Sequence, residues 1–208
     1  MTYDDMAIMI CSPRDHPLPK AMAEARMVGS SITLPYGTLS DLDNLLAKNI
    51  DLKVIHLIMH GDAAWRNPDG SVTSTPAWTD MKGNIITEAP ETVVRTIAAH
   101  ATQLELVFIN ACDTAPLGEA LVAAGVRRAI CWETIVDDEV AMAFSTDFYD
   151  AAKKGMTYTY EDAFNYAWRK NAANLCRLDC RLKRVNGVPG VLVNVPRMVA
   201  MAWWCRDS

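Results

Sequence analysis

A histidine and a cysteine each follow a short apolar run of this sequence. His60 and Gly61 come directly after the run Val54–Met59, and Cys112 comes just after the run Leu104–Asn110. Short continuous apolar runs of this kind are typical of buried central strands. In an open α/β sheet the ligand crevice lies outside the carboxyl ends of the strands. If the two strands are neighbours, both side chains project into one crevice, where a thiol and an imidazole can work as nucleophile and acid–base catalyst.

Each of these residues also has an ordinary structural explanation. Cys112 fits a small buried hydrophobic residue, because free cysteines are among the most buried residue types. His60 fits a polar residue that ends a strand before a glycine turn. The alternation of Asn110, Cys112 and Thr114 places Cys112 on the same side as Asn110. His56 and His60 have the spacing of a zinc-binding helix, but the run is strand-like and lacks that motif's glutamate, so we expect neither a metal site nor a cofactor.

The elements that position these residues alternate between strands and helices, as in a mainly parallel α/β sheet. Strands are expected at Ala7–Cys11, Ile32–Leu34, Val54–Met59, Leu104–Asn110, Arg128–Trp132 and Val191–Val195. Helices are expected at Leu18–Val28, Asp41–Lys48, Glu91–His100, Pro116–Ala124, Asp138–Lys153 and Tyr160–Leu175. Residues 62–84 show little periodicity and predict a long loop with room for a small hairpin. We therefore expect one domain over residues 1–208, a three-layer αβα sandwich around a mostly parallel six-stranded sheet.

Composition excludes several classes of protein. The chain has 208 residues, of which 50% are hydrophobic, and a net charge of -5. This length and apolar content suit a globular domain with a proper core. The acidic balance argues against a nucleic-acid module that works through a basic field. No apolar stretch reaches the roughly 18 residues of a membrane span. The acidic start, residues 1–5, is unlike a signal peptide, so we expect a cytoplasmic protein whose six cysteines are not disulfide staples.

The blocks around His60 and Cys112 resemble the two catalytic blocks of the CHAT domain, a caspase-like cysteine protease family. They read VIHLIMHG at residues 54–61 and LVFINACDT at residues 106–114. The histidine precedes the cysteine by about 50 residues, as it does in caspases. Four further segments resemble the family in the same order: AAGVRRA at 123–129, WETIVDD at 132–138, AFSTDFY at 143–149 and EDA at 161–163. The resemblance covers residues 53–167 well, residues 1–52 less well, and the chain after about residue 170 poorly.

The resemblance implies a caspase-like fold and a cysteine endopeptidase that acts on protein or peptide substrates. Cys112 would attack the scissile carbonyl, and His60 would protonate the leaving amine and then activate water. The backbone N–H groups of Gly61 and Cys112 would stabilise the oxyanion. The family pattern requires neither a third catalytic residue nor a metal, and it implies activation by a protein partner or by processing.

Three aspartates are candidates for substrate binding. By resemblance to separase-like relatives, Asp137 or Asp138 would bind an Arg or Lys side chain at the cleaved position. One of the two is also expected to cap the helix that follows. Asp113 fits either local turn chemistry or the rim of a substrate pocket.

A second interpretation belongs to another class of protein. A catalytically silent caspase-like scaffold would keep the fold and bind partners without cleaving them. The reactivity of Cys112 relative to the other cysteines distinguishes the two. The basic stretch Arg177–Arg184 is interpreted either as a solvated face or as a site of self-cleavage.

Overall fold

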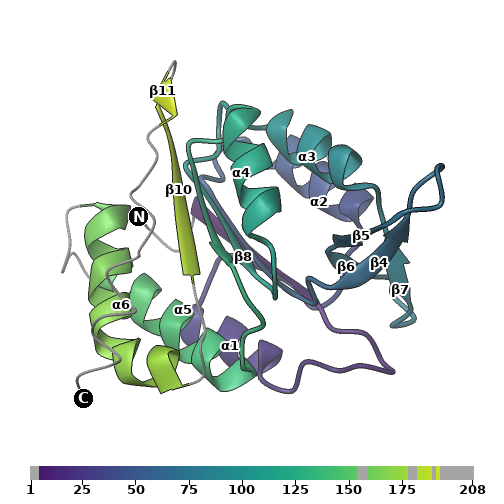
Figure 1. Ribbon diagram of the computed structural model, residues 1–208. Coiled ribbons are helices and arrows are strands. Elements are labelled where there is room, and N and C mark those ends of the chain that lie inside the picture. The colour runs from purple at the N-terminus through teal and green to yellow at the C-terminus, as the bar shows by residue number, and fades with distance from the viewer. Residues whose placement is uncertain (1–4, 154–158, 178–181, 189–190, 193–208) are drawn as a thin grey trace.

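The sheet at the centre of the molecule consists mainly of parallel strands (Figure 1). The computed structural model describes residues 5–153, 159–177, 182–188 and 191–192. Within them, a seven-stranded sheet has the order β11-β10-β9-β8-β3-β1-β2. The strands are β1 (Met6–Cys11), β2 (Ile32–Leu34), β3 (Val54–Met59), β8 (Leu106–Asn110), β9 (Arg128–Trp132), β10 (Leu182–Val188) and β11 (Val191–Leu192). The first five pair with one another in parallel, whereas β10 runs antiparallel to β9 and β11 antiparallel to β10.

Helices cover both faces of this sheet (Figure 1). One face carries α1 (Ala21–Val28), α5 (Asp138–Lys153) and α6 (Tyr160–Arg177). The other face carries α2 (Leu39–Lys48), α3 (Pro90–Ala98) and α4 (Ala115–Ala123). The predicted α/β class with three layers is therefore confirmed, and the sheet is consistent with a caspase-like fold.

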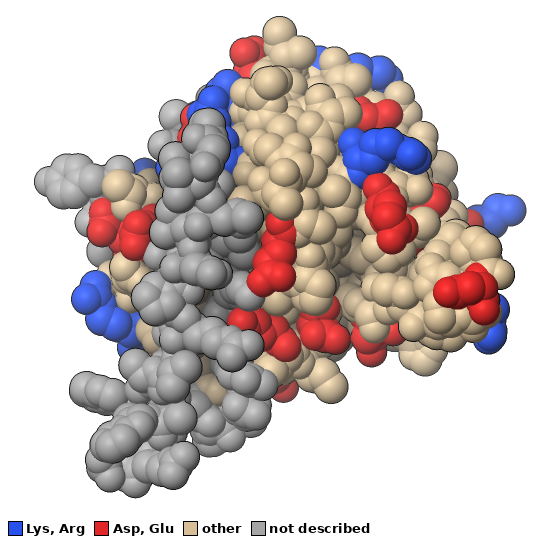
Figure 2. All heavy atoms as spheres, turned by 45° about the horizontal axis from the view of Figure 1, so that its top comes forward, with Lys and Arg blue, Asp and Glu red and all other residues tan. Residues whose placement is uncertain are grey.

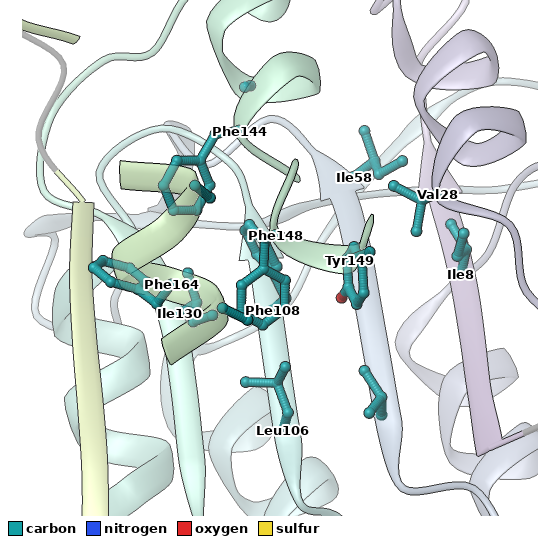
Figure 3. Packing of buried hydrophobic residues seen from close by; sticks show 14 of the residues in the cluster. Ile8, Val28, Ile58, Leu106, Phe108, Ile130, Phe144, Phe148, Tyr149 and Phe164 are labelled. Atoms are coloured by element: carbon teal, nitrogen blue, oxygen red, sulfur yellow. The ribbon is translucent and has the colours of Figure 1, made fainter. Parts of the chain in front are cut away.

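Aromatic side chains fill the layer between the sheet and the α5–α6 pair (Figure 3). Phe108 on β8 lies at the centre, with ring centroids 6.3 Å from Phe144, 5.7 Å from Phe148 and 5.9 Å from Tyr149. All four side chains are fully buried. Large aromatic residues contribute much of the burial energy of a core, so this cluster fixes α5 firmly on the sheet.

Two segments differ from the expectation. Residues 62–84 were expected to form a loop with room for one small hairpin, but there are two: β4 (Ala63–Arg66) pairs with β5 (Val72–Thr75), and β6 (Ala77–Thr79) pairs with β7 (Ile85–Thr87), which lies beyond the predicted loop. Strand β10 was not predicted; it lies partly in the basic stretch and pairs with β9 from Leu182 to Asn186. Within the described residues β11 pairs with β10 at Gly187 and Val188, so residues 182–186 lie at the edge of the sheet, where few apolar residues are needed and alternation is weak. With β10 the sheet has seven strands, one more than the six expected. The strand expected at Val191–Val195 is present as β11, and residues 193–195 lie outside the described part.

The surface carries charges of both signs. Figure 2 shows one face on which the described Asp, Glu, Lys and Arg side chains form separate groups rather than one basic field. Among the described helices, none combines the length and the apolar character that a membrane-crossing helix needs.

Candidate active site

The two strands that precede His60 and Cys112 are neighbours in the sheet. β3 pairs with β8 in parallel, and Ile58 lies opposite Asn110. Side chains alternate between the two faces of a strand, so the next residues on the same face are His60 and Cys112. Both line one pocket at the carboxyl edge of the sheet. The expectation that adjacent strand ends bring the imidazole and the thiol to one crevice is confirmed.

A close backbone contact holds these two segments together. A Cβ atom at Gly61 would lie 1.8 Å from the carbonyl oxygen of Cys112 and 2.9 Å from Cγ2 of Thr114. Atoms in ordinary contact are about twice as far apart as the first distance, so only glycine fits at this position. The Gly61 backbone therefore lies directly against the Cys112 peptide.

The chain turns sharply after Cys112. Asp113 has a φ of 52°, in the left-handed region that few non-glycine residues adopt. The turn is anchored because Asp113 N–H donates to the Thr134 carbonyl at 3.2 Å and Thr114 N–H donates to the Trp132 carbonyl at 2.9 Å. Such local strain persists only where the surroundings fix it, and it is common beside functional residues.

The Cys112 thiol is half-buried and held by one neighbour. Val136 N–H donates to its Sγ at 3.4 Å. Burial raises the pKa of Cys112, and the negative charges of Asp62 and Asp138 raise it further, against the lowering effect of the bond from Val136. The resting side chain is therefore a thiol at neutral pH. Cys11 and Cys131 are fully buried, and burial raises the pKa of Cys11 to about 12.

The ring of His60 is oriented by the loop between β1 and α1. Its Nε2 lies 2.9 Å from the carbonyl oxygen of His16. A carbonyl only accepts, so Nε2 carries the proton and donates it. This leaves Nδ1 of His60 as the nitrogen that can accept a proton in the neutral ring.

The three candidate aspartates occupy different positions. Asp138 lines the pocket, and its pKa is raised by burial and by its neighbours Asp137 and Glu24, although the nearby His60 opposes the shift. Asp137 Oδ1 accepts from the N–H groups of Glu139 and Val140 at 2.9 and 3.3 Å, which confirms that one of the pair caps α5. Asp113 is exposed and is not part of the pocket lining.

A buried acid, Glu24 on α1, also lines the pocket and was not among the candidates from the sequence. Only 2% of its surface is exposed. The signal was present in the helix pattern, because Glu24 shares the spacing of the buried residues Ala21, Ala25 and Val28. A carboxylate on the apolar stripe of a helix needs partners, and here they come from distant parts of the chain.

The pocket is small and mixed in character. Its volume is about 130 Å³, below the roughly 300–1,000 Å³ of sites for drug-sized ligands, and it suits one peptide side chain. Its apolar lining includes Leu18, Ala21, Ile58 and Ala141. Among the described residues, no three His, Cys, Asp or Glu side chains gather in a way that would hold a metal ion.

Helices on both faces of a mainly parallel sheet are consistent with a caspase-like fold, and the histidine and the cysteine follow adjacent strands of this sheet. The chain matches the CHAT domain over residues 8–160 and belongs to this family of caspase-like domains. The match confirms the resemblance up to residue 160 and includes the amino-terminal strands, where the resemblance was weaker. The segment at residues 161–163 lies beyond the match. No curated protein matches the chain.

Proposed function

We propose that the protein is a cysteine endopeptidase that cleaves protein substrates through a Cys112–His60 dyad. The observation that carries this proposal is the pairing of β3 with β8, which places both side chains in one pocket. Membership of a family of caspase-like proteases supports the same reaction class. The fold alone would not support a particular reaction, because one fold serves many activities.

The reaction follows from the protonation states of the two side chains. Cys112 Sγ attacks the scissile carbonyl carbon while its proton passes to Nδ1 of His60, because Nε2 is already engaged with His16. His60 then gives this proton to the leaving amine, and a thioester remains. Water attacks the thioester, loses a proton to His60, and the proton returns to the sulfur as the acid product leaves.

The oxyanion would be held by the N–H groups of Gly61 and Cys112. The N–H groups of Asp113 and Thr114 already donate to the carbonyl groups of Thr134 and Trp132, so they are engaged elsewhere. The close approach of Gly61 to the Cys112 peptide supports this assignment, because the backbone after β3 and the backbone after β8 lie in contact there.

Substrate selection in this proposal favours a basic residue before the cleaved bond. Asp138 lines the pocket, whereas the Asp137 side chain is occupied at the start of α5. Regulation by a protein partner or by processing is also part of the proposal. The raised pKa of Cys112 supports regulation, because a half-buried thiol that stays protonated is a poor nucleophile until its surroundings change.

The raised pKa of Cys112 also favours a second candidate, a catalytically silent scaffold. A thiol bound by Val136, with a pKa raised by burial and by the charges of Asp62 and Asp138, fits a site that never reacts. The two functions differ in the reactivity of Cys112 with an alkylating reagent.

The test is cleavage of a proteome-derived peptide pool, read by mass spectrometry, with wild-type protein, Cys112→Ala and His60→Ala. Cuts that appear only with the wild type support the endopeptidase. If there are no cuts and iodoacetamide modifies Cys112 no faster than the buried Cys11 and Cys131, the scaffold is the better description.

A further inference from the structure

Glu24 is a buried carboxylate whose hydrogen bonds are unevenly distributed. Its Oε1 accepts from His56 Nε2 at 2.8 Å, from Asn110 Nδ2 at 2.6 Å and from Ser145 Oγ at 2.7 Å. Among the described residues, each hydrogen bond to this carboxylate ends on Oε1. Glu24 also lines the pocket beside Cys112, so Oε2 is the oxygen that remains for an occupant.

Glu24 is bound by one histidine and by two neutral side chains, Asn110 and Ser145. His56 Nε2 lies 2.8 Å from Glu24 Oε1, and His56 Nδ1 lies 3.2 Å from the hydroxyl oxygen of Tyr149. Lys20, the one Lys or Arg among the described residues that line the pocket, lies 3.0 Å from Glu139 Oε1. A buried carboxylate with one oxygen that accepts no hydrogen bond from the described residues favours a cation that enters from the pocket.

The site is also rigid. Asn110, which holds Glu24 through Nδ2, accepts from Trp132 Nε1 at 2.6 Å through its Oδ1. Trp132 is fully buried. Residues on α1, β3, β8, β9 and α5 thus fix the carboxylate in one position, and a preformed anion costs no reorganisation when a substrate binds.

The shape of the pocket suits a long side chain with a charged end. The methylene groups of lysine or arginine would run along the apolar walls formed by Ile58 and Ala141, with the cation at Glu24. Asp138 also lines the pocket and adds to its negative potential.

We propose that Glu24 is the specificity-determining residue for a Lys or Arg side chain at P1, the residue directly before the cleaved bond. The inference rests on the proposed endopeptidase, and it moves the main contact from Asp138 to a helix that precedes the first catalytic block. P1 is assigned because its side chain is the nearest one to the carbonyl that Cys112 attacks.

The experiment compares two covalent peptide reagents, acyloxymethyl ketones with arginine or with the neutral isostere citrulline at P1. Labelling of Cys112 is followed in the wild type, in Glu24→Gln and in Glu91→Gln, a matched change of an exposed acid on α3. The glutamine amide in Glu24→Gln is expected to keep an acceptor oxygen for the three donors. Loss of one partner of a buried charge pair weakens binding strongly, so the arginine reagent should react at least about 30-fold faster than the citrulline reagent in the wild type and Glu91→Gln. In Glu24→Gln the two rates should be within about threefold of each other.

A second measurement needs only the wild-type protein. Butylguanidinium should slow the modification of Cys112 by iodoacetamide, and butylurea, which has the same shape without the charge, should not. Equal effects of the two compounds would overturn the inference, as would an arginine preference that persists in Glu24→Gln. Failure of the proposed function looks different: no reagent, iodoacetamide included, would then modify Cys112 selectively.

Discussion

Replacement of Gly61 by alanine tests whether the two catalytic segments must touch. The new Cβ would lie 1.8 Å from the Cys112 carbonyl oxygen, where ordinary contact begins at 3.4 Å. Both groups belong to backbone or sit directly on it, so no side-chain rotation relieves the clash. The segments that carry His60 and Cys112 would have to separate by about 1.6 Å, the difference between these distances. A misplacement of about 1 Å costs roughly 100-fold in rate, so Gly61→Ala should lower Cys112-dependent cleavage by at least about 100-fold.

The control separates this effect from a general loss of stability. Gly37→Ala places its Cβ 2.6 Å from Sδ of Met9, a flexible side chain that can move away. Overpacking of this kind costs about 1–3 kcal/mol, so both variants should unfold at lower denaturant concentration than the wild type. Only Gly61→Ala should lose cleavage per folded molecule. A folded Gly61→Ala variant that cleaves within about threefold of the wild-type rate would refute the argument from contact.

Three further predictions concern the site and its supports. Asp62→Asn removes a charge that raises the pKa of Cys112, so the rate of iodoacetamide modification should rise with pH at lower pH values than in the wild type. As a control, Asp113→Asn changes an exposed residue beside Cys112 in the chain and should leave the pH dependence of modification unchanged. If Asp62→Asn also left this pH dependence unchanged, the electrostatic argument would be contradicted. Phe108→Ala empties the centre of the aromatic cluster and should lower the free energy of unfolding by about 3–5 kcal/mol in chemical denaturation, whereas a loss below about 1 kcal/mol would mean that the core collapses around the gap. Asp137→Ala removes the cap of α5 and should cost about 1 kcal/mol with no change in P1 preference. A lost preference for basic residues at unchanged stability would instead assign Asp137 to the pocket.

The sequence predicts most of the frame on which the site is built. The strands Val54–Met59 and Arg128–Trp132 and the helix Asp138–Lys153 occur with the expected bounds. Their apolar periodicity is local and strong, since a buried strand is apolar throughout and a helix repeats every three to four residues. The positions of His60 and Cys112 follow from the same reasoning, because each comes after a recognisable strand.

Sequence reasoning was weaker where residues depend on partners far along the chain. Strand β10 has little apolar pattern of its own and forms against β9, about 50 residues earlier. The hairpins at residues 63–87 likewise have short strands whose pairing depends on the turns between them.

The sequence by itself determined the class of the fold, the family and the two residues that we propose for catalysis, because these depend on local periodicity and on short motifs. Only the tertiary structure decided what surrounds them. Glu24 lies 32 residues from His56, 86 from Asn110 and 121 from Ser145, and no local pattern brings these together. The contact of Gly61 with Cys112 is of the same kind. Such contacts arise when helices pack onto a sheet and place side chains of distant segments at one point, and this packing decides where the charge of the pocket lies.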